Sequence, residues 1–164
     1  MDQNCEEVSV IKELLDKKLK KDVFADKVEK ETFIECKVGN FIFFINLKDV
    51  YIILDFKPLV EIPGAPPHLL GLVYYQGEVI PILDLKSYLN QTLVQKTIDT
   101  RYVIIKAKDE LLGIFVDESS KMISIPKPSI EPVDEELFSF KCKYQNDEIK
   151  ILDVLKCYNV FKID

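Results

Sequence analysis

The most restrictive feature of the sequence is an internal repeat. Residues 75–85 (YQGEVIPILDL) align without a gap on residues 144–154 (YQNDEIKILDV), and six of the eleven positions are identical. Ile62-Pro63 and Ile125-Pro126 occupy corresponding places upstream. Similarity at a fixed spacing indicates a duplicated structural unit. We therefore predict two repeats, over about residues 32–89 and 102–158, and because each copy is too short to bury much surface alone, we expect them to share one core.

Short runs rich in β-branched and aromatic residues, separated by turn residues, predict a mainly β fold. The predicted strands cover residues 33–38, 41–46, 59–62, 70–75, 79–83, 102–108, 111–117, 122–125, 138–144 and 148–152, with hairpin turns at 39–40 and 109–110. Strands of this length close economically into small barrels, which removes exposed sheet edges. We therefore predict two packed, pseudo-symmetric, five-stranded barrels. The strand order within each stays open, because duplicated halves can exchange strands.

Three helices are expected outside the strands. Residues 4–21 carry an apolar stripe at helical spacing, formed by Val8, Ile11, Leu15 and Leu19. A charged tether then leads to the main domain, so we divide the chain into residues 1–31 and 32–164. Short helices are predicted after Asp84 and at the C-terminus after Asp153, with both aspartates as helix caps. Whether the leading helix packs on the domain or docks on a partner stays open.

Charge and composition exclude several classes of function. The net charge of −6 would repel a phosphate backbone, so we expect no binding to nucleic acid. No apolar run approaches the roughly 20 residues that span a bilayer. The four cysteines show no C-x-x-C pair, and no secretory signal precedes the domain, so free thiols in a cytoplasmic protein are expected.

The residues that catalysis would need are few. His68 is the only histidine and follows Pro66-Pro67, where a solvated loop residue is expected. The glycines form no phosphate-binding motif, so we expect no nucleotide cofactor. One histidine beside dispersed cysteines is too small a ligand set for a metal. These observations predict a binding protein without catalytic, metal or cofactor sites.

One segment resembles a known family. Residues 71–85 (GLVYYQGEVIPILDL) are similar to the central motif of CheW domains, in which G-V-x-N-x-R-G leads into an apolar strand, a proline and D-L. The resemblance extends more weakly from Phe33 to Phe161. It includes Val50 in a short helix, Ile62-Pro63, and residues 113–117 (GIFVD), which look like the family's G-x-x-V-D.

The resemblance implies a fold, partners and a binding region. CheW proteins consist of two SH3-like five-stranded barrels and are non-enzymatic scaffolds that couple chemoreceptors to a CheA-type histidine kinase in chemotaxis. The implied partners are the cytoplasmic tips of the chemoreceptors and the regulatory domain of the kinase, at receptor arrays, with membrane association only through the receptors. Receptor-facing positions would be Val50, Ile52, Gly71, Gln76 and Gly77, with kinase contacts on the other barrel.

The chain departs from the family pattern at two polar positions. Gln76 stands where the family usually has Arg, and Ile52 where it commonly has Glu. Replacing both members of a charge pair leaves no uncompensated charge, so folding tolerates it. The alternative is therefore a divergent CheW-fold protein that binds another signalling partner or senses a small molecule. Such a sensor would need a pocket between the barrels, with Tyr74, Gln76 and His68 as its polar groups.

Overall fold

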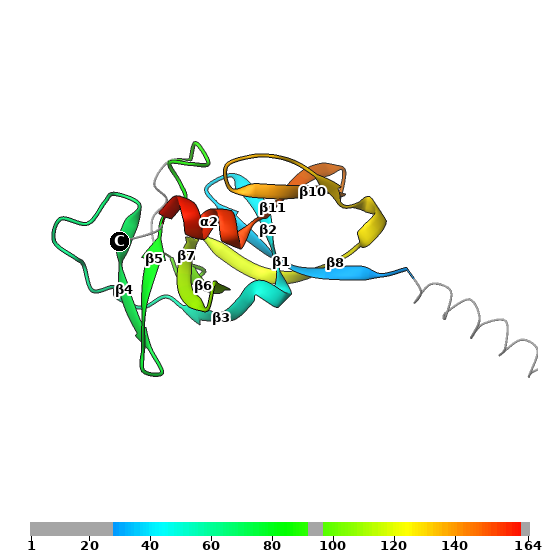
Figure 1. Ribbon diagram of the computed structural model, residues 1–164. Helices are drawn as coiled ribbons and strands as arrows, with labels where there is room; N and C mark the ends of the chain where they lie inside the picture. The colour runs from blue at the N-terminus through cyan, green and yellow to red at the C-terminus, as the bar shows by residue number, and fades with distance from the viewer. Residues whose placement is uncertain (1–27, 92–96, 162–164) are drawn as a thin grey trace, which may run out of the picture. The chain divides into compact units, whose positions relative to one another are not determined.

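The computed structural model describes residues 28–91 and 97–161 (Figure 1). The predicted helix over residues 4–21 lies outside the described residues. Residues 1–30 and 31–164 form two separate units. The architecture below is that of the second unit, and Lys30, the last residue of the first unit, is also the first residue of strand β1.

The second unit is mainly β, as the sequence predicts, with two sheets and a C-terminal helix. In chain order the elements are β1 (Lys30–Val38), β2 (Phe41–Asn46), the 3-10 helix η1 (Leu47–Asp49), β3 (Val50–Asp55), β4 (Leu69–Tyr75), β5 (Glu78–Leu83), β6 (Arg101–Ala107), β7 (Glu110–Val116), β8 (Glu118–Pro126), the 3-10 helix η2 (Lys127–Ser129), β9 (Glu131–Pro132), β10 (Phe138–Tyr144), β11 (Asp147–Leu152) and α2 (Val154–Phe161).

The structure corrects the predicted elements at four places. Val50 does not lie in a helix: η1 ends at Asp49, and the β-branched run that follows forms β3. The predicted strand 59–62 is reduced to a single bridge between Val60 and Leu72. Residues 86–90 after Asp84 form turns rather than a helix, and Asn90, with φ 54°, ends them. The second hairpin turns at residues 108–109 instead of 109–110.

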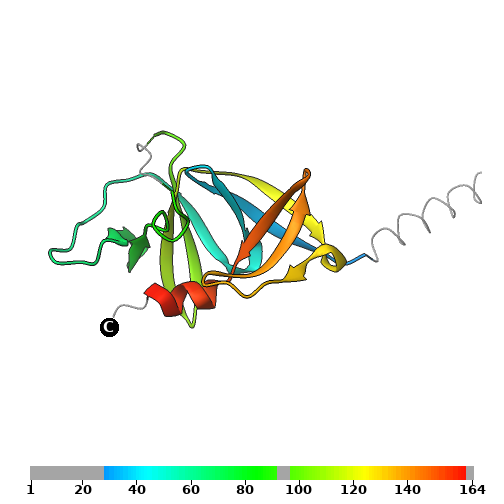
Figure 2. The same ribbon diagram turned by 90° about the horizontal axis from the view of Figure 1, so that it is seen from above.

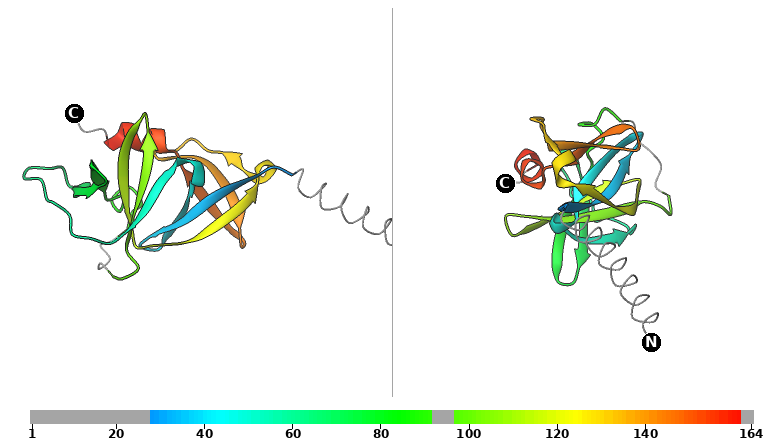
Figure 3. Two further views of the ribbon diagram at one scale, coloured as in Figure 1. Left: turned by 90° about the horizontal axis from the view of Figure 1, so that it is seen from below. Right: turned by 90° about the vertical axis from the view of Figure 1, so that its right-hand side faces the viewer.

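The two predicted repeats exchange strands between the sheets. The six-stranded sheet has the order β8-β1-β2-β11-β10-β9, and the five-stranded sheet has the order β3-β6-β7-β5-β4 (Figures 2 and 3). Two parallel pairings join the halves: β11 pairs with β2, and β5 pairs with β7. The exchange that the duplicated sequence left open therefore occurs, and each sheet contains strands from both halves.

Matching hairpins carry the two repeated sequence segments. Gln76 and Gly77 connect β4 to β5, and Gln145 and Asn146 connect β10 to β11, each as a two-residue turn with positive φ at both positions. This geometry is that of a type I′ turn, which suits the twist of a hairpin and favours Gly and Asn.

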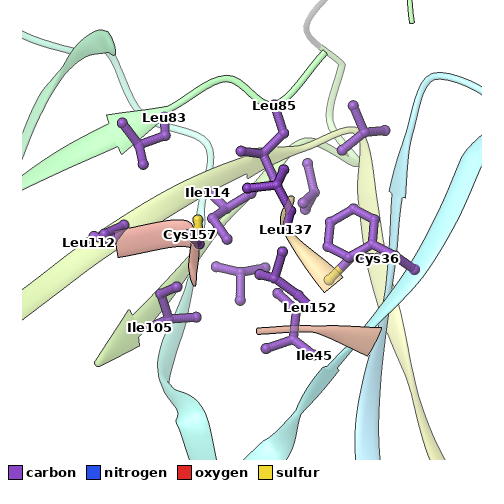
Figure 4. Close-up of a cluster of buried hydrophobic side chains, with 14 of the residues drawn as sticks. Cys36, Ile45, Leu83, Leu85, Ile105, Leu112, Ile114, Leu137, Leu152 and Cys157 are labelled. Atoms are coloured by element: carbon purple, nitrogen blue, oxygen red, sulfur yellow. The ribbon is translucent and has the colours of Figure 1, made fainter. Parts of the chain in front are cut away.

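The main core lies between the two sheets and is covered by α2. Figure 4 shows this cluster, in which β1 supplies Cys36, β5 supplies Leu83, β11 supplies Leu152 and α2 supplies Cys157. Asp153 starts α2 as predicted, because its Oδ1 accepts hydrogen bonds from the backbone N–H of Leu155 (2.9 Å) and Lys156 (3.0 Å). Each sheet also has one smaller apolar cluster, on the side that faces away from the main core.

The thiols of Cys36, Cys142 and Cys157 are free, as predicted, and all three are buried. Burial raises the pKa of Cys36 and of Cys157 from 9.0 to about 12 in each case. A buried thiol without a stabilising cation is a poor nucleophile, because the thiolate is the reactive form. These residues therefore serve as small apolar core residues.

Gly113 allows β5 and β7 to approach each other. It pairs with Ile82 across the parallel junction. A Cβ atom at position 113 would overlap Ile82 Cδ1 and would lie 2.8 Å from Ile104 Cδ1. A side chain at position 113 would therefore displace the Ile82 and Ile104 methyl groups at this contact between the two halves.

We expect Gly113→Ala to lower the free energy of unfolding by about 1–3 kcal/mol, because the added methyl overpacks this junction. Ile82→Val removes the Cδ1 atom that the methyl would meet. The double variant should therefore lose less than the sum of the two single losses, measured by urea denaturation. Additive losses would contradict the proposed clash.

We expect the buried thiols to make stability fall at alkaline pH. Because the pKa of both thiols is raised in the folded state, the unfolded chain loses these protons at lower pH than the folded chain does. The free energy of unfolding is therefore unaffected by these thiols below pH 9 and decreases as pH rises from 9 toward 12. Each thiol lowers the free energy of unfolding by up to about 1.4 kcal/mol per pH unit in this range. A Cys36→Ala, Cys157→Ala double variant should show a shallower decline in denaturation midpoints between pH 9 and 10.5, and an unchanged slope would refute this role.

Candidate protein-binding surface

The five predicted receptor-facing residues all lie in the five-stranded sheet or in its β4–β5 turn. Val50 and Ile52 belong to β3, and both are partly buried. Gly71 is buried in β4, whereas Gln76 and Gly77 are exposed in the turn. Although β3 and β4 are the opposite edges of this sheet, Ile52 and Tyr75 pack against the same apolar cluster.

Lys57 connects the two edges directly. It follows β3, and its Nζ donates a hydrogen bond to the carbonyl oxygen of Tyr74 at the end of β4 (3.3 Å). The same ammonium group lies 5.7 Å from the centroid of the Tyr75 ring, within the range of a cation–π contact. The buried Tyr102 hydroxyl holds this segment by donating to the carbonyl of Lys57. Lys57 therefore links the segment after β3 to the end of β4, next to the turn that carries Gln76 and Gly77.

An apolar surface covers the outer side of the β4–β5 hairpin. Tyr74 pairs with Val79, Leu72 pairs with Pro81, and Val60 bridges to Leu72. Residues two apart on a strand, and residues directly opposite each other, share one face of a sheet. We name this set the hairpin face: Val60, Leu72, Tyr74, Val79 and Pro81.

The hairpin face is unusually open to solvent for apolar residues. The exposed fractions are 68% for Val60, 67% for Tyr74 and 58% for Val79. Contiguous exposed apolar patches on a soluble domain commonly mark interaction sites. The hairpin face is therefore a candidate surface for binding another protein.

A groove of about 450 Å³ continues from the hairpin face toward α2. Its apolar lining includes Val79, Pro81 and Tyr158, and Tyr51 lines it from β3. Glu78, Asp109 and Glu110 supply carboxylates to the same lining, together with Lys106. Tyr51 separates Val50 from Ile52, and Glu78 follows Gly77, so the groove adjoins the predicted residues without including them.

Sequence reasoning missed Tyr51, Val60 and Tyr158 as surface residues. Alternation along β3 would have indicated that Tyr51 faces away from Ile52, but β3 itself was not predicted. Val60 was assigned to a strand, and Tyr158 belongs to a helix whose position depends on both sheets.

His68 and Asp84 both make contacts that hold the fold together. The His68 ring packs 4.9 Å from the Phe161 ring and is partly buried, which corrects the expectation of a solvated loop residue. Asp84 Oδ1 accepts a hydrogen bond from the Lys86 N–H (2.9 Å). Within residues 28–91 and 97–161, no group of three or more His, Cys, Asp or Glu residues is arranged to hold a metal ion.

Comparisons with known proteins identify the family. The model of the CheW-like domain matches residues 32–159. The chain belongs to the CheW-like domain family. It is 25% identical over 144 residues to the chemotaxis protein CheW of Helicobacter pylori, covering 85% of this chain and 86% of that protein. It is 31% identical over 91 residues to CheW of Bacillus subtilis, covering 56% and 58%.

A solved structure has the same fold. The scaffolding protein TtCheW from Thermoanaerobacter tengcongensis superposes with a TM-score of 0.74 at 21% identity, covering 83% of this chain and 95% of that one. In the described part of the present chain, no helix is both long and apolar enough to cross a membrane.

The structure shows the surroundings of Ile52 and Gln76, the two residues that differ from the CheW family pattern. Ile52 packs against an apolar cluster that includes Leu54, Val73 and Ile104, so an aliphatic side chain suits its position. Gln76 is exposed at the tip of the hairpin with φ 46°. The aliphatic side chain of Ile52 therefore leaves no charge unpaired at this partly buried position, whereas at position 76 a charged or an uncharged side chain would be solvated.

We expect Gly71→Ala to destabilise the hairpin face. A Cβ atom at position 71 would lie 2.7 Å from the Val60 carbonyl oxygen and 3.0 Å from Leu59 Cβ, which would push the Val60 bridge away from β4. The cost should be about 1–3 kcal/mol. Gly64→Ala is the matched control, because Gly64 also has positive φ (+77°) but no atom within 4 Å. Equal losses in thermal unfolding would exclude the steric explanation.

Proposed function

We propose that this chain is a non-enzymatic coupling scaffold of chemotaxis. It binds the cytoplasmic tips of chemoreceptors and the regulatory domain of a CheA-type histidine kinase at the same time, in the cytoplasm at receptor arrays. It meets the membrane only through the receptors. Membership of the CheW-like family supports this proposal, together with the exposed hairpin face on the five-stranded sheet.

The receptor-facing region in this proposal comprises Val50, Ile52, Gly71, Gln76 and Gly77. Gly71 supports it through the close approach of the Val60 segment, which holds the apolar residues of the hairpin face in position. Gly77 supports it through the tight turn at the hairpin tip, where φ is +81°. The kinase would then contact the six-stranded sheet, since a scaffold needs two surfaces that two partners can occupy together.

We infer further that each sheet closes into an SH3-like barrel. The contacts across the five-stranded sheet favour closure, because Ile52 and Tyr75 from its two edge strands pack on one cluster and Lys57 reaches Tyr74. Closure protects edge strands from pairing with other chains. The division at residue 31 and the repeats over 32–89 and 102–158 stay predictions of the sequence.

The test is the autophosphorylation rate of a CheA-type kinase with receptor-bearing membranes, with and without this protein at matched concentrations. We expect kinase activity to become receptor-dependent only when the protein is present. Binding without a change in rate would reduce its role to that of a competitor or spacer, and the absence of binding to either partner would refute the proposal.

Variants of the hairpin face make the test specific. We expect Tyr74→Ser with Val79→Ser to weaken receptor binding at least about tenfold, because interface anchors of this size commonly contribute more than 1 kcal/mol each. Stability should change little, since both side chains are exposed. Ile98→Ser is the control, because Ile98 is 88% exposed but lies outside the hairpin face. Equal effects of both changes would mean that the hairpin face is not the binding surface.

A further inference from the structure

A second groove, of about 490 Å³, lies on the six-stranded sheet. It is formed by the start of β1, the end of β2 with η1, the η2 segment, β10, and the junction of β11 with α2. The residues that line it are Glu31, Phe33, Asn46, Lys48, Asp49, Lys127, Ile130, Ser139, Phe140, Ile151, Leu152, Asp153 and Val154. We name it the acidic groove.

The acidic groove has an apolar floor with one open aromatic side chain. Phe33, Ile151 and Leu152 are buried beneath it, whereas Phe140 is 46% exposed. Ile130 packs on the adjoining apolar cluster. An aromatic or aliphatic side chain from outside could therefore bury apolar area here, which is favourable in proportion to the area removed from water.

Three carboxylates lie close together in this groove. Glu31 is held by Asn46, whose Nδ2 donates to Glu31 Oε2 (3.0 Å), and Asp153 is held by the N-terminal N–H groups of α2. In the described part of the chain, no hydrogen bond or ion pair reaches the Asp49 carboxylate. Burial raises the pKa of Asp49, Lys48 lowers it, and the negative charges of Asp153 and Glu31 raise it further.

This arrangement favours an incoming cation next to an apolar group. Asp49 has lost part of its hydration and is repelled by two other carboxylates. Lys48 and Lys127 supply the positive charges of the same lining, so the three carboxylates leave it net negative, and a further cation would offset that charge. A guanidinium or ammonium group can also donate hydrogen bonds to the carboxylate oxygens. Charge and apolar area thus point to the same kind of occupant.

We propose that the acidic groove receives a segment of a protein partner in which an aromatic or aliphatic residue stands beside an arginine or lysine. The inference rests on the proposed scaffold function, which requires a second surface apart from the hairpin face. The hairpin face belongs to the five-stranded sheet and the acidic groove to the six-stranded sheet. Two partners can therefore bind without competing for the same residues.

The test uses short probes with the full chain. Acetyl-Phe-Arg-amide is titrated while backbone amide NMR shifts are followed, with acetyl-Phe-Gln-amide and acetyl-Phe-Glu-amide as probes of matched shape and different charge. We expect shifts at residues 46–49 and 151–154 with the arginine probe, weaker shifts with the glutamine probe, and none with the glutamate probe. Equal shifts with all three, or none with the arginine probe at 10 mM, roughly the weakest binding that such a titration resolves, would overturn the proposal.

Two variants locate the binding. Asp49→Asn keeps the size of the side chain and should weaken binding of the arginine probe about fivefold or more, since charge-assisted hydrogen bonds are the stronger ones. Asp147→Asn removes an exposed carboxylate in the β10–β11 hairpin, outside the groove, and should leave affinity within about twofold. Equal losses in both variants would mean a general charge effect and would overturn the assignment to the groove.

The outcomes separate this inference from the proposed function. Probe binding without receptor-dependent kinase activity would support the acidic groove and refute the coupling role. Receptor-dependent activity without probe binding would support the coupling role and refute the acidic groove.

Discussion

The structure depends on two reciprocal parallel pairings between the halves of the chain. The last strand of the first half, β5, pairs with β7 of the second, and the last strand of the second half, β11, pairs with β2 of the first. Neither half can complete its sheet alone, and the apolar core between the sheets takes side chains from both. Gly113 leaves room for the Ile82 and Ile104 side chains at one of these junctions. Folding of each half is therefore coupled to folding of the other.

This coupling explains how the β4–β5 hairpin comes to present an exposed apolar face. The β4–β5 hairpin is anchored to the rest of the sheet through β5, so one face is buried in the sheet's own apolar cluster while Val60, Tyr74 and Val79 remain open to solvent. The described cysteines are used as core residues, and His68 packs on Phe161. An apolar face that is held in place before binding lowers the ordering cost of recognising another protein.

The two candidate surfaces differ in their chemistry. The hairpin face offers mainly apolar area, whereas the acidic groove combines a partly open Phe140 with the carboxylates of Glu31, Asp49 and Asp153. Apolar area supplies affinity, and charge arrangement selects the partner and its orientation. A chain that binds two unlike proteins would discriminate between them through this contrast.

The sequence alone determined the mainly β class, most strand positions, the Asp153 cap and the family motif, because these depend on local periodicity, on turn chemistry and on the repeated segment. It did not determine β3, since the resemblance placed Val50 in a helix, nor the loss of the strand at 59–62. Which strands share a sheet, and therefore that Val50 and Gly71 lie in the same sheet while Phe33 and Ile151 lie beneath a separate groove, was decided only by the tertiary structure. The physical reason is that exchanged and unexchanged strand pairings satisfy the same local patterns, and only packing across the sheets distinguishes them.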